Sequence, residues 1–207
     1  MSKRKALDYN PPTTSSHSSF HSELAPKLAK LNKEIRKCRK CPLWKARIKT
    51  VPGEWPVNAK IMIIGQAPGA EENKTGRPFV GRAGQFLNKL LKITGIKRKK
   101  IFITSIVKCF SPKNRKPTKE EIEICLSYLK QQIEIINPKN FILLGEVAFS
   151  VFFPDKKLSN FRGKFIKKDG REYFTTYHPA AGIRFQKFKK ILEKDFKKLR
   201  TYNSLTI

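Results

Sequence analysis

The sequence predicts an α/β protein, a three-layer α/β/α sandwich with a central four-stranded, mostly parallel sheet. Two observations carry this prediction. Short apolar runs that suit buried strands alternate with amphipathic segments that suit helices along most of the chain. The chain has 207 residues, 39% of them hydrophobic, which is enough for one ordinary domain with its own core. Such alternation favours a parallel sheet, because helices connect successive parallel strands.

The predicted strands are short apolar runs that end near Gly or a polar residue. In parallel α/β sheets, the loops that follow the carboxyl ends of the strands form the ligand site. The segments after these runs are therefore the first places to look for function. The four predicted strands cover residues 60–66, 101–107, 140–145 and 172–178.

The predicted helices have recognisable ends. Ser22 is expected to cap the first helix, and Gly95 is expected to close the second. Thr118 and Glu121 have the spacing of a capping box. Segment 65–84 is too polar for a core and too long for a turn, so it is predicted as a functional loop. The predicted helices cover residues 22–38, 85–95, 118–136, 146–153 and 185–200.

The N-terminal segment differs in composition from the rest of the chain. Residues 1–22 are rich in Ser, Thr, Pro and His and are predicted to be a disordered tail before a domain at 23–203. No stretch approaches the roughly 18 apolar residues of a membrane span. The basic N-terminus lacks the apolar centre of a secretory signal. We therefore expect a cytoplasmic, nucleoid-associated protein that is neither secreted nor in a membrane.

The charge of the chain is strongly positive. The chain has 45 Lys and Arg residues but only 16 Asp and Glu residues, which gives a formal net charge of +29. This excess predicts attraction to polyanions, with nucleic acid as the first candidate and an anionic membrane surface as the second. A lysine-rich proteome would produce a similar excess without any polyanionic partner.

The four cysteines form two pairs. Cys38 and Cys41 are separated by two residues, and Cys109 and Cys125 by fifteen. A thiolate site for zinc or an iron–sulfur cluster fits all four, and the spacing does not choose between them. Four unrelated buried thiols are the alternative. Basic residues nearby are expected to lower the pKa of the thiols and favour ligation. These residues are Lys37, Arg39, Lys40 and Lys108.

Three motifs, in order, resemble those of the family 4 uracil-DNA glycosylases. They read GQAPGAEENKTGRPFVGRAG (65–84), VKCFSPKNRKPTKEEIEIC (107–125) and YHPAAGIRF (177–185). The resemblance runs from about Cys38 to Arg200. It implies a monomeric enzyme that acts on uracil-containing DNA by hydrolysing the N-glycosidic bond of deoxyuridine. It also implies a [4Fe-4S] cluster. The cluster ligands would be Cys38, Cys41, Cys109 and Cys125.

The resemblance also implies a uracil pocket. Phe79 would stack on the flipped base, and His178 would face uracil O2, where a donor stabilises the departing anion. Glu72 is expected to position the attacking water, and Gln66 to hold it as well. Outside these motifs, Phe79 and His178 would be read as core or loop residues. The loop lacks the glycine and lysine spacing of nucleotide-binding loops. The backbone lining the pocket would come from Gly65, Gln66 and Ala67.

Two positions depart from the family pattern. Many relatives have Glu where this chain has Gln66, and the family usually has Asn where this chain has Ser105. That Asn amide pairs with the uracil edge, and one hydroxyl cannot replace both of its ends. We therefore expect relaxed or shifted base selectivity. An alternative is a nucleic-acid-binding iron–sulfur protein of the same fold with lost or altered base specificity, and a further one is a zinc-stabilised adaptor.

Two segments are expected to contact DNA. The residues that follow His178 are bulky enough to wedge into the base stack, although packing at the start of a helix is an alternative. They are Ile183, Arg184 and Phe185. The loop after Cys109 offers polar and cationic side chains for phosphates. They are Lys113, Asn114 and Arg115.

Overall fold

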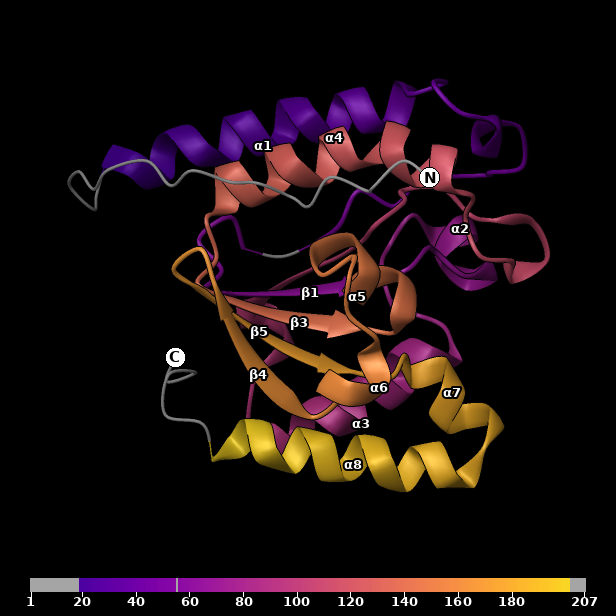
Figure 1. Cartoon of the computed structure of the whole chain (residues 1–207). Coiled ribbons are helices and arrows are strands. Elements are labelled where there is room, and N and C mark those ends of the chain that lie inside the picture. Colours follow the sequence, from indigo (N-terminus) through magenta and orange to yellow (C-terminus); the bar gives the residue numbers. More distant parts are fainter. Residues whose placement is uncertain (1–18, 55, 202–207) are drawn as a thin grey trace.

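The computed structural model describes residues 19–54 and 56–201 of the chain. Its centre is a five-stranded sheet with the strand order β2-β1-β3-β5-β4 (Figure 1). Every neighbouring pair is parallel except β4 with β5, which is antiparallel. The strands are β1 (Ile61–Gly65), β2 (Ile101–Ser105), β3 (Asn140–Leu144), β4 (Lys164–Lys168) and β5 (Arg171–Thr176).

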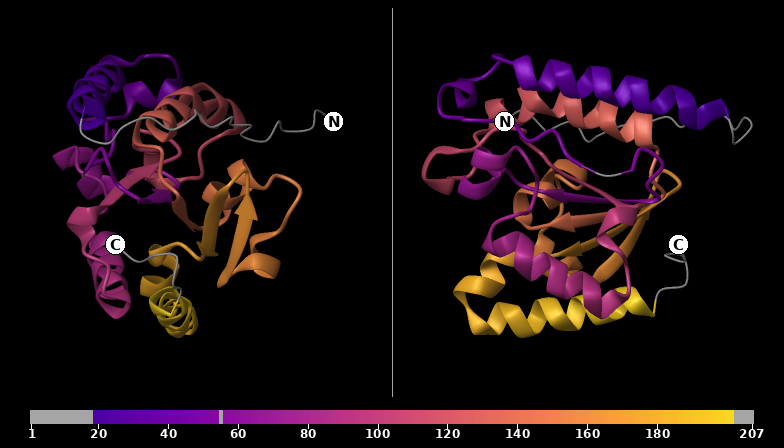
Figure 2. Two further views of the ribbon diagram at one scale, coloured as in Figure 1. Left: turned by 90° about the vertical axis from the view of Figure 1, so that its left-hand side faces the viewer. Right: turned by 180° about the vertical axis from the view of Figure 1, so that it is seen from behind.

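Helices cover both faces of the sheet, so the predicted three-layer sandwich is confirmed. Helices α1 and α4 run side by side over one face, and α3 and α8 lie against the other (Figures 1 and 2). The α-helices are α1 (Ser19–Lys37), α2 (Ala70–Thr75), α3 (Arg82–Thr94), α4 (Lys119–Ile136), α5 (Glu146–Phe152), α6 (Leu158–Phe161), α7 (Pro179–Arg184) and α8 (Gln186–Arg200). Short 3-10 helices are η1 (Pro42–Lys45), η2 (Arg98–Lys100) and η3 (Pro112–Asn114).

The sheet separates two apolar cores. Met62 and Ile64 of β1 pack into the core that contains residues of α1, α4 and α5. Ile61 and Ile63 pack into the core that contains residues of α3 and α8. Successive residues of a strand point to opposite faces, so a run in which every residue is apolar is what a strand covered on both faces requires. This explains why the continuous apolar runs predicted the parallel strands.

Four strands were predicted, whereas the sheet has five. The fifth strand, β4, lies at the edge of the sheet and joins β5 through a tight turn in which Asp169 and Gly170 have φ of 52° and 67°. Two central residues with positive φ are typical of a hairpin turn, and Asp-Gly is a favoured sequence for it. The strand is only partly buried, and three of its five residues are Lys, so it lacks the apolar run used to find the others.

The helix boundaries differ from the prediction at two places. Helix α1 spans Ser19–Lys37, so Ser22 lies within the helix and does not cap it. Residues 1–18 of the predicted tail lie outside the described residues. The segment 65–84 is not all loop, because it contains α2 and the first turn of α3. The predicted capping box of Thr118 and Glu121 is confirmed.

None of the helices in the described ranges is long and apolar enough to cross a membrane.

Candidate active site

The candidate site lies where the carboxyl ends of the parallel strands meet. Gly65 at the end of β1 pairs in register with Ser105 at the end of β2, and His178 follows β5. The pairing continues past the strands, since the backbone N–H of Ile106 donates to the Gly65 carbonyl at 2.9 Å. The carboxyl ends of the strands thus bring together residues that lie far apart in the sequence, as expected for this class of fold.

Phe79 reaches this edge from the loop between α2 and α3. Its ring is buried and stacks on the His178 imidazole, with 5.7 Å between the ring centroids and 29° between the planes. The ring also lies directly over Gly65, because a Cβ added there would be 2.7 Å from Phe79 Cζ and 3.4 Å from Ser105 Oγ. A side chain at position 65 would therefore displace the ring, which accounts for glycine at the end of β1.

His178 is a neutral imidazole that is held in one tautomer. Its Nδ1 accepts a hydrogen bond from the backbone N–H of Ala180 at 3.2 Å, so the neutral ring carries its proton on Nε2. Burial, with a smaller contribution from the positive charge of Arg184, lowers the pKa of His178 to about 4. At neutral pH the residue is a neutral donor through Nε2–H.

A partly buried ion pair anchors the strand that precedes His178. Asp195 of α8 is fully buried and pairs with Arg162. Its Oδ2 accepts a hydrogen bond from Thr176 Oγ1 at 2.7 Å. Loss of Arg162 would leave the buried carboxylate of Asp195 without its cationic partner, which is destabilising. The end of β5, two residues before His178, is therefore tied to the C-terminal helix.

Glu72, which we expected to position water, is engaged with the backbone. Its side chain is buried, and Oε1 accepts hydrogen bonds from the N–H groups of Val80 and Gly81 at 2.8 and 2.9 Å. Its neighbour Glu71 pairs with Lys74 on the surface. The carboxylate oxygen of Glu72 thus supports the loop that carries Phe79.

Gln66 and Ala67 continue the chain past β1 and are half-buried. The Gln66 carbonyl accepts a hydrogen bond from the Val107 N–H at 3.2 Å. Both residues therefore lie beside the segment that links Ser105 to Cys109.

A buried lysine lies under this segment. Lys108 Nζ donates hydrogen bonds of 2.7 Å to Thr104 Oγ1, to the Ser105 carbonyl and to Gln132 Oε1. Burial lowers its pKa to about 7. Its backbone N–H donates to Cys125 Sγ at 3.3 Å. Lys108 therefore connects the end of β2 with the cysteine-bearing helix α4.

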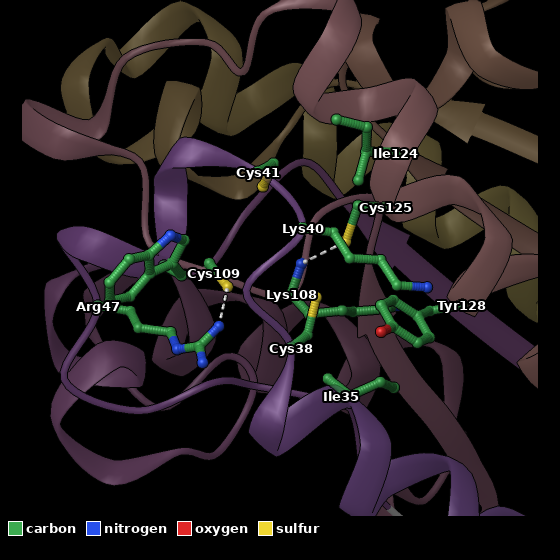
Figure 3. A pocket seen from close by; sticks show the side chains of 11 residues that line it. Ile35, Cys38, Lys40, Cys41, Arg47, Lys108, Cys109, Ile124, Cys125 and Tyr128 are labelled. Atoms are coloured by element: carbon green, nitrogen blue, oxygen red, sulfur yellow. Dashed lines mark hydrogen bonds between the residues drawn. The ribbon is translucent and has the colours of Figure 1, made fainter.

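All four cysteines line one cavity between the end of α1, the loop after β2 and α4 (Figure 3). They are free thiols. Arg47 Nη1 donates a hydrogen bond to Cys109 Sγ at 3.3 Å. The sulfur atoms surround the cavity without converging on one point: in the described part of the chain, no three His, Cys, Asp or Glu side chains form a group that could hold a metal ion.

Lys108 acts to lower the pKa of Cys125, as expected, but the expectation that the thiols have lowered pKa values overall was wrong. Burial raises the pKa of Cys41 and Cys109, and it raises that of Cys125 to about 12 against the opposing charge of Lys108. Desolvation of a thiolate outweighs its attraction to a cation at these positions. Without a bound metal the three groups are neutral thiols at pH 7, so a ligand that binds them as thiolates must displace protons.

The family model described as the uracil DNA glycosylase superfamily matches residues 52–200, which include all five strands and the residues at their carboxyl ends. The chain belongs to this superfamily. It is 44% identical to the type-4 uracil-DNA glycosylase of Sulfurisphaera tokodaii over 84% of this chain and 83% of the relative. It is 44% identical to the type-4 uracil-DNA glycosylase of Saccharolobus solfataricus over 81% and 82%. A type-5 uracil-DNA glycosylase of Pyrobaculum aerophilum is 32% identical over 75% and 76%. The resemblance to the type-4 members is thus confirmed.

In this superfamily member, exposed apolar residues follow His178 in the chain. Ile183 is 39% exposed at the end of α7, and Phe185 is 59% exposed directly after it. Arg184 between them is also exposed. Among the described residues, the other large hydrophobic residue with comparable exposure is Ile48. The helix-start packing considered as an alternative does not bury these side chains.

The loop after Cys109 places its three predicted DNA contacts differently. Lys113 and Asn114 are exposed on η3, both with φ of 55°. Arg115 instead forms a bidentate pair with the buried Glu121, at 2.8 and 2.7 Å. Its guanidinium therefore fixes the loop to the start of α4.

Sequence reasoning missed several residues that support the site. Arg98 donates hydrogen bonds to the carbonyls of Pro78 and Phe79, and Gly84 gives the Phe79 carbonyl room. Arg98 belongs to the basic run Lys97–Lys100, whose composition is that of a solvated surface. Gly84 lies within α3, where glycine is unfavourable and therefore points to a close approach.

Proposed function

We propose that this chain is a monofunctional uracil-DNA glycosylase, which hydrolyses the N-glycosidic bond of deoxyuridine in DNA and initiates base excision repair. The observation that carries the proposal is the pairing of His178 with Phe79: a neutral imidazole with its donor on Nε2 lies against an aromatic ring at the sheet edge. The names of the type-4 relatives, which align with four-fifths of the chain, support the same activity.

The pocket residues fit the demands of the reaction. As the glycosidic bond breaks, its electron pair passes to N1 of uracil and spreads to O2, while the sugar becomes an oxocarbenium-like cation. His178 Nε2–H donates to O2 and stabilises this negative charge, as an oxyanion hole does. Phe79 stacks on the extruded base, and the backbone of Gly65, Gln66 and Ala67 lines the pocket.

Water completes the reaction by adding to the sugar carbon and losing a proton to solvent. We propose that Gln66 holds this water, because it directly follows β1 and is half-buried at the carboxyl end of that strand. Glu72 supports the Phe79 loop through its bonds to Val80 and Gly81. We therefore treat Glu72 as a positioning residue, in place of the water-positioning role expected from the sequence.

We propose that Cys38, Cys41, Cys109 and Cys125 hold a [4Fe-4S] cluster. Four free thiols around one cavity are a suitable donor set, because iron–sulfur clusters are held by four cysteine thiolates. The cluster would act as a structural cross-link between the end of α1, the loop after β2 and α4. The Arg47 guanidinium and the Lys108 N–H, which bond to Cys109 and Cys125, would stabilise the thiolates.

Base selectivity depends on Ser105 at the end of β2. The side chain is buried near Gly65, and a single hydroxyl pairs with fewer groups of a base edge than an amide does. We propose that this position relaxes the selectivity for uracil.

DNA would be held by residues on both sides of the pocket. Ile183, Arg184 and Phe185 would enter the base stack, and Lys113 and Asn114 would contact phosphates. Arg115 would position that loop through Glu121. We further propose that the protein acts as a monomer in the cytoplasm, associated with the nucleoid.

The proposal is tested by incubating protein purified without oxygen with duplexes that contain one uracil, cytosine, hypoxanthine or thymine. We expect release of free uracil and an alkali-labile abasic site, with no strand cleavage before alkali. Binding of the duplex without release of any base would support the nucleic-acid-binding alternative.

A further inference from the structure

The loop that carries Phe79 has an unfavourable backbone conformation. Phe79 has φ of 51°, in the left-handed region that residues other than glycine, Asn and Asp rarely adopt. Such a conformation persists only where surrounding groups determine it, and it occurs preferentially at functional sites. The groups that hold this loop are therefore candidates for control of the pocket.

Four successive residues of this loop, Pro78 to Gly81, each have one backbone group bound by a side chain from elsewhere. On the carbonyl side, Arg98 Nη2 donates to the Pro78 oxygen at 2.7 Å and Nη1 donates to the Phe79 oxygen at 3.3 Å. On the amide side, Glu72 Oε1 accepts from Val80 and Gly81. The two side chains thus hold the peptide groups on both sides of Phe79.

Arg98 is itself held in place. Its Nη1 also donates to Asn88 Oδ1 at 2.9 Å, and Nη2 donates to Glu54 Oε1 at 3.2 Å. Glu54 also pairs with Arg77, through Nε at 2.9 Å. The Arg98 side chain is only 21% exposed. The two terminal nitrogens of Arg98 thus bind four acceptors, which restrains the guanidinium, and lysine cannot reproduce this fork of donors.

The helix that follows leaves no room for the loop to relax. A Cβ added to Gly84 would collide with the carbonyl oxygen of Phe79, the same oxygen that Arg98 binds. On its other side, the Phe79 ring rests on Gly65 and stacks on His178. A shift of this backbone would therefore move the ring relative to the His178 donor.

We propose that Arg98 is a positioning residue for the reaction. It fixes the position of the Phe79 ring in the proposed uracil pocket. The inference rests on the proposed function, because it assumes that uracil stacks on Phe79. It assigns to Arg98 no contact with the base or with DNA. Its loss would let Phe79 leave the left-handed conformation, and the pocket would lose its stacking surface while the DNA-binding residues remained in place.

The test compares Arg98→Gln with Arg77→Gln. Arg77 is the matched control, because it loses the same charge and the same partner, Glu54, but binds neither the Pro78 nor the Phe79 carbonyl. Three quantities are measured: the single-turnover excision rate, inhibition by free uracil, and affinity for an abasic duplex. A displacement of reacting groups by about 1 Å costs roughly 100-fold in rate. We therefore expect Arg98→Gln to lose about 10- to 100-fold in rate, with weaker inhibition by uracil and unchanged duplex affinity.

Further variants keep the test decisive if Arg98→Gln does not fold. Asn88→Ala removes one orienting bond of Arg98 without touching the loop, and Arg98→Lys keeps the charge, so both should show smaller losses in the same direction. Unchanged uracil inhibition in every Arg98 and Asn88 variant, or equal effects of Arg98→Gln and Arg77→Gln, would overturn the inference while the wild type excises uracil. A wild type that excises no base would instead overturn the proposed function, and this inference with it.

Discussion

Phe79 and His178 stack at the carboxyl edge of the sheet, although 98 positions separate them in the sequence. One ring offers a stacking face and the other a hydrogen-bond donor, because His178 Nδ1 is already occupied by the Ala180 N–H. A base that lies against Phe79 therefore meets a donor whose position is set by the backbone of α7. The following predictions derive from this arrangement and from the elements that support it.

The pH dependence of excision should show no requirement for a protonated His178. Burial, with a contribution from Arg184, lowers the pKa of His178 to about 4, so the imidazole is neutral at every pH well above that value. We expect the single-turnover rate to be nearly constant between about pH 5.5 and 8 at fixed ionic strength. If the reaction needed imidazolium, the rate would instead fall about tenfold for each pH unit above 4.

Replacement of Cys125 by Ser should prevent binding of the proposed cluster and destabilise the protein. Cys125 is buried in α4 and lines the cavity with the other three thiols. Because cofactor binding contributes to folding free energy, a loss of about 3 kcal/mol would lower Tm by roughly 6–12 °C for a domain of this size. Visible absorbance, iron content and Tm are measured. Ser127→Ala, on the exposed side of the same helix, is the control and should retain all three.

Truncation of Phe185 should affect duplex substrates selectively. The side chain is 59% exposed, so Phe185→Ala should change the unfolding free energy by no more than about 0.5 kcal/mol. Loss of about 1–3 kcal/mol of base stacking should slow excision from a duplex at least about fivefold. Excision from a single strand, which needs no wedge, should change little. Ile48→Ala removes a similarly exposed apolar side chain, 68% exposed, and serves as control. Equal effects of the two variants would argue against a wedge.

Replacement of Ser105 by Asn should narrow base selectivity. An amide at the end of β2 can donate and accept at once, whereas the wild-type hydroxyl makes fewer bonds to a base edge. The ratio of excision rates for uracil over hypoxanthine and cytosine is measured for the wild type and for Ser105→Asn and Ser105→Ala. We expect the ratio to rise in the Asn variant only. A wild type already strictly specific for uracil would contradict the relaxed selectivity.

The parallel part of the fold was predictable from sequence because it is buried on both faces. Runs such as Ile61–Gly65 are apolar at nearly every position, and no exposed structure explains such a pattern. The edge strand β4 carries Lys at three of five positions, so only the Asp169–Gly170 turn could have identified it. Helix α2 was hidden because its six residues, Ala70–Thr75, lie between glycines in a polar segment.

The site was predictable where a residue type carries its own chemistry. His178 and the four cysteines could be selected from motifs, and the structure brings the cysteines to one cavity. The supporting residues could not be selected, because Arg98 and Lys108 look like surface cations until the fold places them against carbonyl oxygens. For the same reason, Arg115 resembled a free phosphate contact although Glu121 binds it.

The most direct test of the central claim is the single-turnover rate of uracil excision by variants of His178 that retain wild-type visible absorbance. His178→Ala removes the donor, which should cost about 100- to 1000-fold. His178→Gln places an amide N–H near the position of Nε2 and should recover part of that loss, whereas His178→Asn reaches only as far as Nδ1 and should recover less. Wild-type rates in the Ala variant would contradict the assignment of His178 as the donor to the departing base.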